Sequence, residues 1–497
     1  MSKLTAEQAE IVTSKSRKLV VAARAGSGKT YTLVEYARQN PRVRMLYLAY
    51  NRAIRDEAVS KFPVNVDCKT SHQLAFFSCG KPLAGKLSAN LRLRDIATAA
   101  QSNNWTFARD VLDTLNAFMS SESDALCAEH FTRLDDNKNA SSKVVRYQME
   151  VVDWAAQLWE RMIDPNDKFP ATHDTYLKLF QLSQPRLSER YGAILFDEAQ
   201  DSNPVTSAIV LNQSCTLVIV GDPHQQIYRF RGANDAMSHP LLADADRMYL
   251  THSFRFGPQV AFVANALLEL KGETRPVVGQ GGADEVLSSM AYETSERHTA
   301  YINRTVMGVI ADAIRSASHG LKTYWVGGIE GYNITDLLDV YHLSCGKTGE
   351  IRNQRIKSEY RDYGDYCAVA EATRDLEMLR TIKILDTYGD IPACIDKLHQ
   401  FAVKDEMESR VTVTTAHRSK GLEWDDVLLC DDFPDFLSGD MDEDERNDEI
   451  NLLYVACTRA MRRLYISSTM ERVLNYVAAL RRERQAPQIE EGAGRAN

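Results

Sequence analysis

A glycine-rich segment near the start of the sequence has the residue types of a phosphate-binding loop. Residues 23–30 spell ARAGSGKT, after the apolar β-branched run KLVVAA at 18–23 and before a helical pattern at 30–39. A strand before the loop and a helix after it are the context that such a loop requires. Ala23 stands where the usual pattern has glycine, and the alternative is a glycine-rich turn with an incidental lysine. The flanking elements favour the phosphate-binding loop.

The chemistry expected of this loop follows from its backbone and its last two residues. Gly26 and Gly28 let the chain curl so that N–H groups point at phosphate oxygens, and the next helix adds positive potential at its start. Lys29 is then expected to reach the β- and γ-phosphates, and Thr30 to ligate Mg²⁺. The residues expected around the triphosphate are Ala25, Gly26, Ser27, Gly28, Lys29 and Thr30.

A pair of carboxylates follows another predicted strand, YGAILF at 191–196. Asp197 and Glu198 therefore lie at the C-terminal end of a strand, where α/β proteins bind ligands. Asp197 is suited to Mg²⁺, so Asp197 and Thr30 form the predicted metal site, and Glu198 is suited to accept a proton from an attacking water. An isolated Asp-Glu pair would mean little. Together with GSGKT it predicts hydrolysis of a nucleoside triphosphate, with Lys29, Asp197 and Glu198 as catalytic residues.

Alternation of apolar strand-like runs with helical patterns predicts an α/β fold with parallel sheets. The expected strands form two sets, at residues 18–23, 43–50, 191–196, 216–220 and 247–250, and at residues 300–304, 323–326, 411–415, 427–429 and 463–467. A polar helical stretch interrupts each set. The sequence therefore predicts two parallel-sheet domains, each with a helical insertion.

The composition of the 497-residue chain is ordinary for a globular protein, with 44% apolar and 26% charged residues. No apolar stretch approaches the roughly 18 residues of a membrane span, and residues 1–10 lack a signal-peptide pattern, so we expect an intracellular protein without a membrane partner. Nine scattered cysteines form no CxxC pair, which gives no support to a zinc ribbon. The net charge of −9 argues only weakly against nucleic acid, and the acidic run at 440–449 is expected to be a solvated loop.

Further segments resemble one branch of the superfamily I helicases. After GSGKT and DEAQ come GDPHQQIYRFRGA, THSFRFG, TTAHRSKGLEWDDV and NLLYVACTRA, in this order along nearly the whole chain. The combination is similar to the UvrD/Rep/PcrA-like DNA helicases, and LYLAYNRAI, KTSHQLA and HDTYLKLFQLS are similar to the F-box DNA helicases within it. With three residues before Leu4, we expect no F-box in this sequence. The resemblance implies two tandem RecA-like domains, ATP and Mg²⁺ as cofactors, and single-stranded DNA and duplex junctions as partners.

The resemblance also implies domain boundaries. We expect a first RecA-like domain, 1A, at 1–84 and 184–255, interrupted by a helical insertion, 1B, at 85–183. A second RecA-like domain, 2A, is expected at 256–332 and 406–480, interrupted by a reduced helical insertion, 2B, at 333–405, and residues 481–497 are expected to be a disordered tail. The second insertion is shorter than in the larger bacterial members of the family, which predicts weaker autoinhibition or altered duplex contact.

For the nucleoside, the family pattern assigns roles to residues outside the loop. Gln8 is similar to the glutamine that reads adenine, and Phe254 stands where an aromatic ring stacks on the base. Glu423, which follows Gly421 closely, is similar to the residue that contacts the ribose. These four residues complete the expected nucleoside site.

For the γ-phosphate, the resemblance implies three more catalytic residues. Gln225 is similar to the residue that senses the γ-phosphate. Arg255 and Arg459 are similar to the two arginines that reach the γ-phosphate from the second domain and stabilise the transition state, as arginine fingers do.

The DNA-contacting residues are also implied by the family pattern. Tyr228 and Phe230 suit base stacking, which is indifferent to sequence. The residues that match positions contacting the sugar-phosphate backbone are Thr70, His72, Thr415 and His417. Tyr50 lies one residue from the usual aromatic of its motif. For each aromatic the alternative is core packing, and for His72 it is a structural histidine.

Three functional classes remain open. The first is a DNA helicase with 3′–5′ polarity in repair, recombination or replication, in the nucleoid of a prokaryotic or viral host or in a eukaryotic nucleus. The second is a translocase that displaces recombinase filaments or other proteins with little unwinding. The third is the motor subunit of a nuclease or defence complex, in which the nuclease would be a separate chain.

Overall fold

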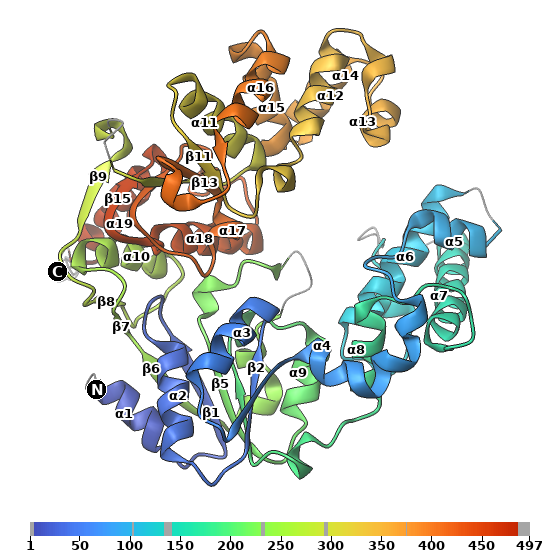
Figure 1. The fold of residues 1–497 in the computed structure, drawn as a ribbon, viewed down its shortest axis with the longest axis vertical. Helices are drawn as coiled ribbons and strands as arrows, with labels where there is room; N and C mark the ends of the chain where they lie inside the picture. The colour runs from blue at the N-terminus through green and yellow to red at the C-terminus, as the bar shows by residue number, and fades with distance from the viewer. Residues whose placement is uncertain are drawn as a thin grey trace, which may run out of the picture. The chain divides into compact units, whose positions relative to one another are not determined.

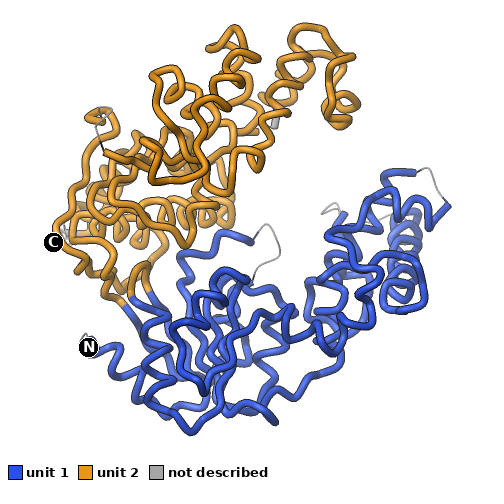
Figure 2. The backbone as a smooth tube through the Cα atoms, in the orientation of Figure 1, with its two compact units in different colours: residues 1–23, 28–250 blue, residues 24–27, 251–497 orange. Residues whose placement is uncertain are grey.

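The computed structural model describes residues 4–101, 104–133, 142–229, 234–292, 297–373 and 375–485. The chain divides into two compact units (Figure 2). Unit 1 comprises residues 1–23 and 28–250, and unit 2 comprises residues 24–27 and 251–497. Each unit contains one large sheet.

Unit 1 is built on a six-stranded parallel sheet with the strand order β3-β2-β4-β5-β1-β6 (Figure 1). Alternate residues of β1 face opposite sides, so Leu19 and Val21 join one apolar cluster and Val20 joins another. Burial on both faces is what makes the strands continuously apolar. The strands are β1 Lys18–Ala23, β2 Met45–Ala49, β3 Val66–Thr70, β4 Ala193–Phe196, β5 Thr216–Gly221 and β6 Asp246–Leu250. The helices beside them are α1 Ala6–Thr13, α2 Lys29–Gln39, α3 Arg52–Lys61 and α9 Pro204–Leu211.

A group of helices is inserted between β3 and β4 of unit 1 (Figure 1). These helices have an apolar core of their own, whose residues lie between Leu91 and Phe169. A second cluster joins α8 to α9 through residues that include Tyr176, Phe180 and Val205. The inserted helices are α4 Ser71–Ala75, α5 Leu93–Ala99, α6 Trp105–Ser120, α7 Ser142–Ile163 and α8 His173–Leu182.

Unit 2 is built on a seven-stranded parallel sheet with the order β12-β11-β13-β10-β14-β15-β9. Its strands are β9 Glu285–Ser288, β10 Thr299–Asn303, β11 Thr323–Trp325, β12 Ala402–Val403, β13 Val411–Thr415, β14 Trp424–Leu429 and β15 Ala460–Ile466. A small two-stranded sheet pairs β7 His252–Ser253 with β8 Val278–Gly279. The helices associated with these strands are α10 Pro258–Leu270, α11 Val306–Ser318, α17 Ala416–Ser419, α18 Glu443–Cys457 and α19 Ser468–Gln485.

The second set of inserted helices follows β11 in unit 2 (Figure 1). Its apolar residues Leu337, Ile384 and Leu398 belong to the same buried cluster as Ile310 of α11 and Val413 of β13. The helices of this insertion are α12 Ile334–Ser344, α13 Gln354–Glu359, α14 Tyr363–Thr373, α15 Leu376–Thr387 and α16 Ile391–Phe401. Helices α12, α15 and α16 therefore share a core with the sheet, while a separate cluster of Val340, Leu343, Ile351, Ile356 and Tyr366 packs inside the insertion.

The predicted fold class is confirmed, because two parallel α/β sheets carry helical insertions as RecA-like domains do. The loop expected at 440–449 is wrong. Asp442 caps α18, and the helix begins at Glu443 with three acidic residues in its first turn, where the helix dipole favours negative charge. Part of the expected disordered tail is helical, since α19 continues to Gln485, and residues 486–497 lie outside the described residues. No helix among the described residues combines the length and the apolar character needed to cross a bilayer.

Candidate functional site

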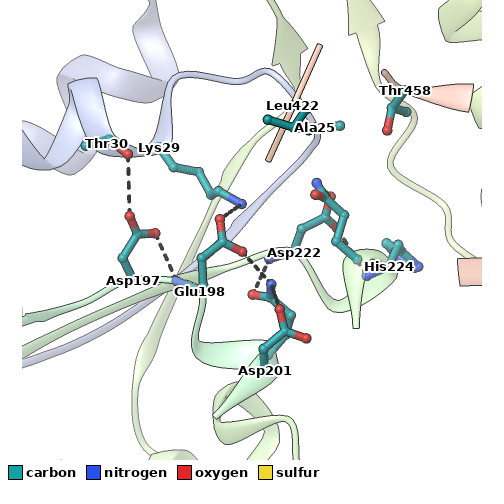
Figure 3. Close-up of polar contacts among 12 residues, drawn as sticks. Ala25, Lys29, Thr30, Asp197, Glu198, Asp201, Asp222, His224, Leu422 and Thr458 are labelled. Atoms are coloured by element: carbon teal, nitrogen blue, oxygen red, sulfur yellow. Dashed lines mark hydrogen bonds and ion pairs between the residues drawn. The ribbon is translucent and has the colours of Figure 1, made fainter. Parts of the chain in front are cut away.

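The glycine-rich loop ends directly at the start of α2 in unit 1. Gly28 caps this helix in a left-handed conformation with a φ of 76°, and Gly26 has a φ of 71°. Such backbone angles suit glycine and leave the first N–H groups of the helix directed outward. Lys29 is the first helical residue, and its Nζ lies 2.9 Å from Oε1 of Glu198 (Figure 3). The predicted phosphate-binding residue and the predicted general base are thus in direct contact.

The charge of Lys29 is stabilised by the carboxylates around it. Burial lowers the pKa of Lys29, but Glu198, Asp197 and Asp222 outweigh it and leave the pKa raised. The side chain is therefore a fixed cation within an acidic surrounding. A cation of this kind matches the charge of a triphosphate.

Asp197 lies at the end of β4, where three donors converge on its carboxylate. Tyr47 donates its hydroxyl at 2.7 Å and Thr30 donates at 3.4 Å, both to Oδ2, while the Glu198 N–H donates to Oδ1 at 2.9 Å. Burial and the charge of Glu198 raise the pKa of Asp197, against the influence of Lys29. Thr30 and Asp197 thus bring two hard oxygen donors together from two elements (Figure 3). This donor set fits Mg²⁺, which prefers oxygen ligands and would relieve the repulsion between the two acids.

Glu198 adopts a left-handed conformation that is uncommon for residues other than glycine, with a φ of 51°. Gln200 stabilises it, because its Nε2 donates to Oε2 of Glu198 at 2.6 Å. The Oε1 of Gln200 accepts the backbone N–H of Asp222 at 3.0 Å, and Gln225 donates to the Asp222 carboxylate at 2.7 Å. Gln225, the predicted γ-phosphate sensor, is thereby linked to the general base through Asp222 and Gln200.

Gln200 received no role from its sequence pattern, although it is the last residue of DEAQ. Its side chain is completely buried and joins two loops that follow different strands. The available signal was its spacing, two residues after an acid at the end of a strand. That spacing places an amide near the acids, but it does not show that Gln200 bonds both to Glu198 and to the backbone of Asp222.

A pocket of about 680 Å³ in unit 2 is lined in part by Glu423, the predicted ribose contact, and the pocket beside the two acids of unit 1 is smaller, at about 310 Å³. It is lined by Asp197 and Glu198 and also by Tyr50, His72 and Tyr228. The rings of Tyr50 and Tyr228 are nearly parallel, with an interplanar angle of 11° and centroids 6.0 Å apart. Tyr50 is 44% exposed, so core packing does not account for it. Aromatic rings in this arrangement offer flat surfaces for a stacked base.

The other predicted DNA contacts of unit 1 have different surroundings. The Thr70 hydroxyl accepts the Gln73 N–H at 3.2 Å and caps α4, so this side chain has a local structural role. The His72 ring lies 3.3 Å from the carboxylate of Asp174 at the start of α8 and is partly exposed. Phe230 lies outside the described residues.

Gln8 is almost fully buried in α1 of unit 1. Its Oε1 accepts the Thr5 N–H at 3.1 Å, and its own N–H donates to the Thr5 hydroxyl at the same distance. This reciprocal pair is a capping box. The predicted adenine contact therefore has a defined orientation set by the start of the helix.

The two predicted arginine fingers lie close together in unit 2. Arg255 donates to the Glu423 carboxylate at 2.7 Å and to the Thr458 carbonyl at 3.0 Å. Arg459 is 1% exposed and donates to the carbonyls of Val455 at 2.8 Å and Leu422 at 3.2 Å. Three separate segments, around residues 255, 422–423 and 455–459, therefore bring both guanidinium groups close to Glu423, the predicted ribose contact.

The first half of the glycine-rich loop packs within unit 2. The Phe254 N–H donates to the Gly26 carbonyl at 2.9 Å, and a Cβ on Gly26 would lie 2.6 Å from that of Arg255. This close approach requires glycine. The Phe254 ring is 45% exposed, as a base-stacking residue must be, and Gly421 has a φ of 87° in the turn before Glu423. The His417 and Thr415 positions are at the end of β13, where the Thr415 hydroxyl caps α17.

Two family models match the chain. The UvrD/REP helicase N-terminal domain matches residues 84–241, and the UvrD-like helicase C-terminal domain matches residues 369–471. The chain belongs to the UvrD-like helicase family.

Two curated relatives align with nearly the whole chain. F-box DNA helicase 1 of Gallus gallus is 34% identical over 514 residues, which cover 95% of this chain and 50% of the relative. F-box DNA helicase protein 1 of Schizosaccharomyces pombe is 32% identical over 528 residues, covering 95% and 58% respectively. This UvrD-like helicase therefore spans about half the length of these relatives, and the resemblance seen in its motifs is confirmed.

Proposed function

We propose that this UvrD-like chain is an ATP-dependent single-stranded DNA translocase and DNA helicase. The observation that carries the proposal is the pocket of about 310 Å³ in unit 1, which Asp197 and Glu198 line together with Tyr50 and Tyr228. Hydrolytic carboxylates and base-stacking rings share one cavity. A DNA base that stacks on the outer face of one of these rings would lie next to the carboxylates proposed to act on ATP, which is the coupling that a DNA motor needs.

In this proposal, Lys29 binds the terminal phosphates and Glu198 accepts the proton of the attacking water. Mg²⁺ on Thr30 and Asp197 would supply charge neutralisation at the phosphates. Arg255 and Arg459 would exchange their present carbonyl and carboxylate partners for the γ-phosphate. Because both arginines are satisfied in this structure, their engagement with phosphate is expected to need a rearrangement of unit 2.

The DNA is expected to stack on Tyr228 and Tyr50 and to contact His72 and His417, with 3′–5′ movement along one strand. Stacking accepts every base, which suits a motor that moves along any sequence. We propose that the protein acts on chromosomal DNA in repair, recombination or replication, in a nucleoid or a nucleus. The two relatives that align with 95% of this chain are named as DNA helicases, which supports DNA as the substrate.

The test is steady-state ATP hydrolysis with and without single-stranded DNA. We expect stimulation by DNA, and we expect Lys29→Ala and Glu198→Gln to reduce turnover at least 100-fold, which is about 2.7 kcal/mol of barrier. Glu198→Gln should retain nucleotide affinity. Glu189→Gln is a suitable control because its side chain is 71% exposed in the same unit. Turnover that DNA leaves unchanged would contradict the proposal.

A translocase that displaces bound proteins is the second candidate. The second insertion is expected to be reduced, with altered duplex contact, which supports a motor that unwinds little. An unwinding assay beside displacement of a recombinase filament from the same strand separates the two activities. Co-purification of a nuclease would instead support a motor subunit of a nuclease or defence complex.

A further inference from the structure

Arg418 of the segment AHRS contacts the chain that leads into the second insertion. The helix α17 is a single turn of four residues after β13. Strand β11 pairs with β13 in parallel, with Trp325 opposite Val413, so the chain that leaves β11 passes close to α17. This departing chain, residues 327–332, is called the glycine turn below, and it leads into α12.

The guanidinium of Arg418 makes three contacts with this region. It donates to the Gly331 carbonyl at 2.5 Å and to the Val326 carbonyl at 3.4 Å. It also lies over the ring of Tyr332, 4.2 Å from the centroid. Tyr332 is fully buried, and its hydroxyl donates to the same Val326 carbonyl at 2.9 Å. The Tyr332 ring on which Arg418 lies is therefore held in place by its burial and by the hydrogen bond of its hydroxyl.

The glycine turn is shaped to admit the guanidinium. A Cβ on Gly331 would lie 2.8 Å from one terminal nitrogen of Arg418, and a Cβ on Gly327 would lie 3.2 Å from it. Gly327 and Gly328 also have φ angles of 81° and 84°. A side chain at Gly331 would therefore displace the flexible end of Arg418 while leaving the backbone of the turn in place.

We propose that Arg418 is a positioning residue that fixes the Thr415–His417 segment for contact with single-stranded DNA by docking on the glycine turn that precedes the second insertion. This inference rests on the proposed function, in which His417 contacts DNA. One helical turn has too few internal hydrogen bonds to be stable alone. Docking of Arg418 on a buried aromatic ring and two carbonyls holds the segment in place. The free energy of DNA binding is then not reduced by the entropy cost of ordering this segment.

The experiment compares two variants that undock Arg418 in different ways. Arg418→Met removes the cation, whereas Gly331→Ala keeps the cation but occupies its place on the turn. Gly349→Ala is the matched control, because its Cβ would meet nothing within 4 Å and it lies in the insertion that follows the glycine turn. The readout is the affinity for fluorescein-labelled oligo(dT), measured by anisotropy at several salt concentrations, beside the melting temperature of each variant.

We expect Arg418→Met and Gly331→Ala to weaken oligo(dT) binding alike, by about tenfold, which is about 1.4 kcal/mol. Gly349→Ala should bind as the unaltered protein does. For Gly331→Ala, the DNA concentration that half-saturates ATP hydrolysis should rise about tenfold while turnover at saturating DNA stays unchanged, a split that general destabilisation does not produce. Arg418→Lys, which keeps a cation for the Tyr332 ring, should recover part of the affinity.

A direct phosphate contact by Arg418 predicts a different pattern and would overturn the proposal. In that case Gly331→Ala, which frees the guanidinium, would not weaken binding, and Arg418→Met would lower the salt slope by about 0.7. Unchanged binding in both variants would also overturn it. If the unaltered protein does not bind oligo(dT) at all, the proposed function itself fails, and the two failures are thereby distinguished.

Discussion

The two helical insertions differ in where their apolar residues go. The first insertion packs around its own core, between Leu91 and Phe169, and joins the rest of unit 1 through a separate cluster on α8 and α9. The second contributes Leu337, Ile384 and Leu398 to the cluster that contains the strands of its sheet. The first is thus a packing unit of its own, whereas the second joins the core it interrupts through α12, α15 and α16 and keeps a small cluster of its own around Tyr366.

This difference decides how far a local change spreads. A cavity in a separate core lowers the stability of that core, while a cavity in a shared core loosens every element that lines it. In the second insertion the shared elements include β13, which ends at Thr415. We therefore expect the stability of the proposed DNA-contacting segment, Thr415–His417, to depend on the second insertion. The positions of Asp197 and Glu198 in unit 1 should not depend on the first insertion.

The largest expected effect comes from one substitution made in each core. Leu337→Ala in the second insertion and Leu115→Ala in the first each remove a completely buried leucine, at an expected cost of about 2–5 kcal/mol. Hydrogen exchange should accelerate in α11 and β13 for Leu337→Ala. For Leu115→Ala it should accelerate in α6 and α7 and remain unchanged in β1, β4 and β5.

The matched pair provides its own control, because both changes delete the same atoms. Exchange that accelerates in β4 and β5 of Leu115→Ala would show that the first insertion is not separate. Exchange confined to α12 in Leu337→Ala would show that the second core is not shared.

A buried charge offers the next test in the first insertion. Lys178 of α8 donates to the carbonyls of Ser121 at 2.8 Å and Ser123 at 2.6 Å, just beyond the end of α6. Lys178→Met would leave both carbonyls without this donor, at an expected cost of about 1–3 kcal/mol. The loss should be confined to α6 and α8, and Lys347→Met, at an exposed position, should cost nothing measurable.

The pH dependence of this variant has a defined sign. Burial lowers the pKa of Lys178 to about 8 from its usual value of 10.5. Between these values the unfolded chain binds more protons, so the lysine contributes increasing stability as pH rises from about 8 to about 10.5. The free-energy gap between the unaltered protein and Lys178→Met should widen over this window in urea titrations. A gap that narrows would contradict the assigned burial.

The sequence predicted the strands of both sheets where the apolar runs were long, as at Lys18–Ala23 and Val411–Thr415. It missed β3 and β9, because VDCKT and EVLS are half-exposed edge strands without a continuous apolar run. The acidic run was misassigned because charge pattern alone does not separate a solvated loop from the first turn of a helix. That turn is fixed by the Asp442 cap and by the buried residues that follow it.

The site was predictable where residues adjacent in sequence act together. Sequence spacing alone predicted the chemical roles of Gly28, Lys29 and Thr30. It also predicted the roles of Asp197 and Glu198. The contact between Lys29 and Glu198 could not be predicted without knowing the order of the strands in the sheet. The nearly parallel rings of Tyr50 and Tyr228 belong to residues that are 178 positions apart in the sequence. No local pattern encodes such a distance, since it depends on the strands between them.

The smallest expected effect concerns the partly buried carboxylate of Glu377, which ties the second insertion to α11. Glu377 of α15 accepts the N–H groups of Val306 at 2.7 Å and Met307 at 2.9 Å, in the first turn of α11. Glu377→Ala removes this cap and should cost about 0.5–2 kcal/mol, as the loss of a helix cap does. If the core is shared, exchange should accelerate in β13 as well as at the start of α11.

Glu377 should also show the opposite pH response to Lys178. Burial raises the pKa of Glu377 above its usual value of 4.5, against the two backbone donors. The folded protein therefore binds more protons in the window above pH 4.5, and this group's contribution to stability falls as pH rises through the folded-state pKa. Urea titrations of the unaltered protein and Glu377→Gln should show the advantage of the glutamate shrinking over that window. An advantage that grows with pH would mean that the two N–H donors outweigh burial, and that this carboxylate strengthens the junction most when it is charged.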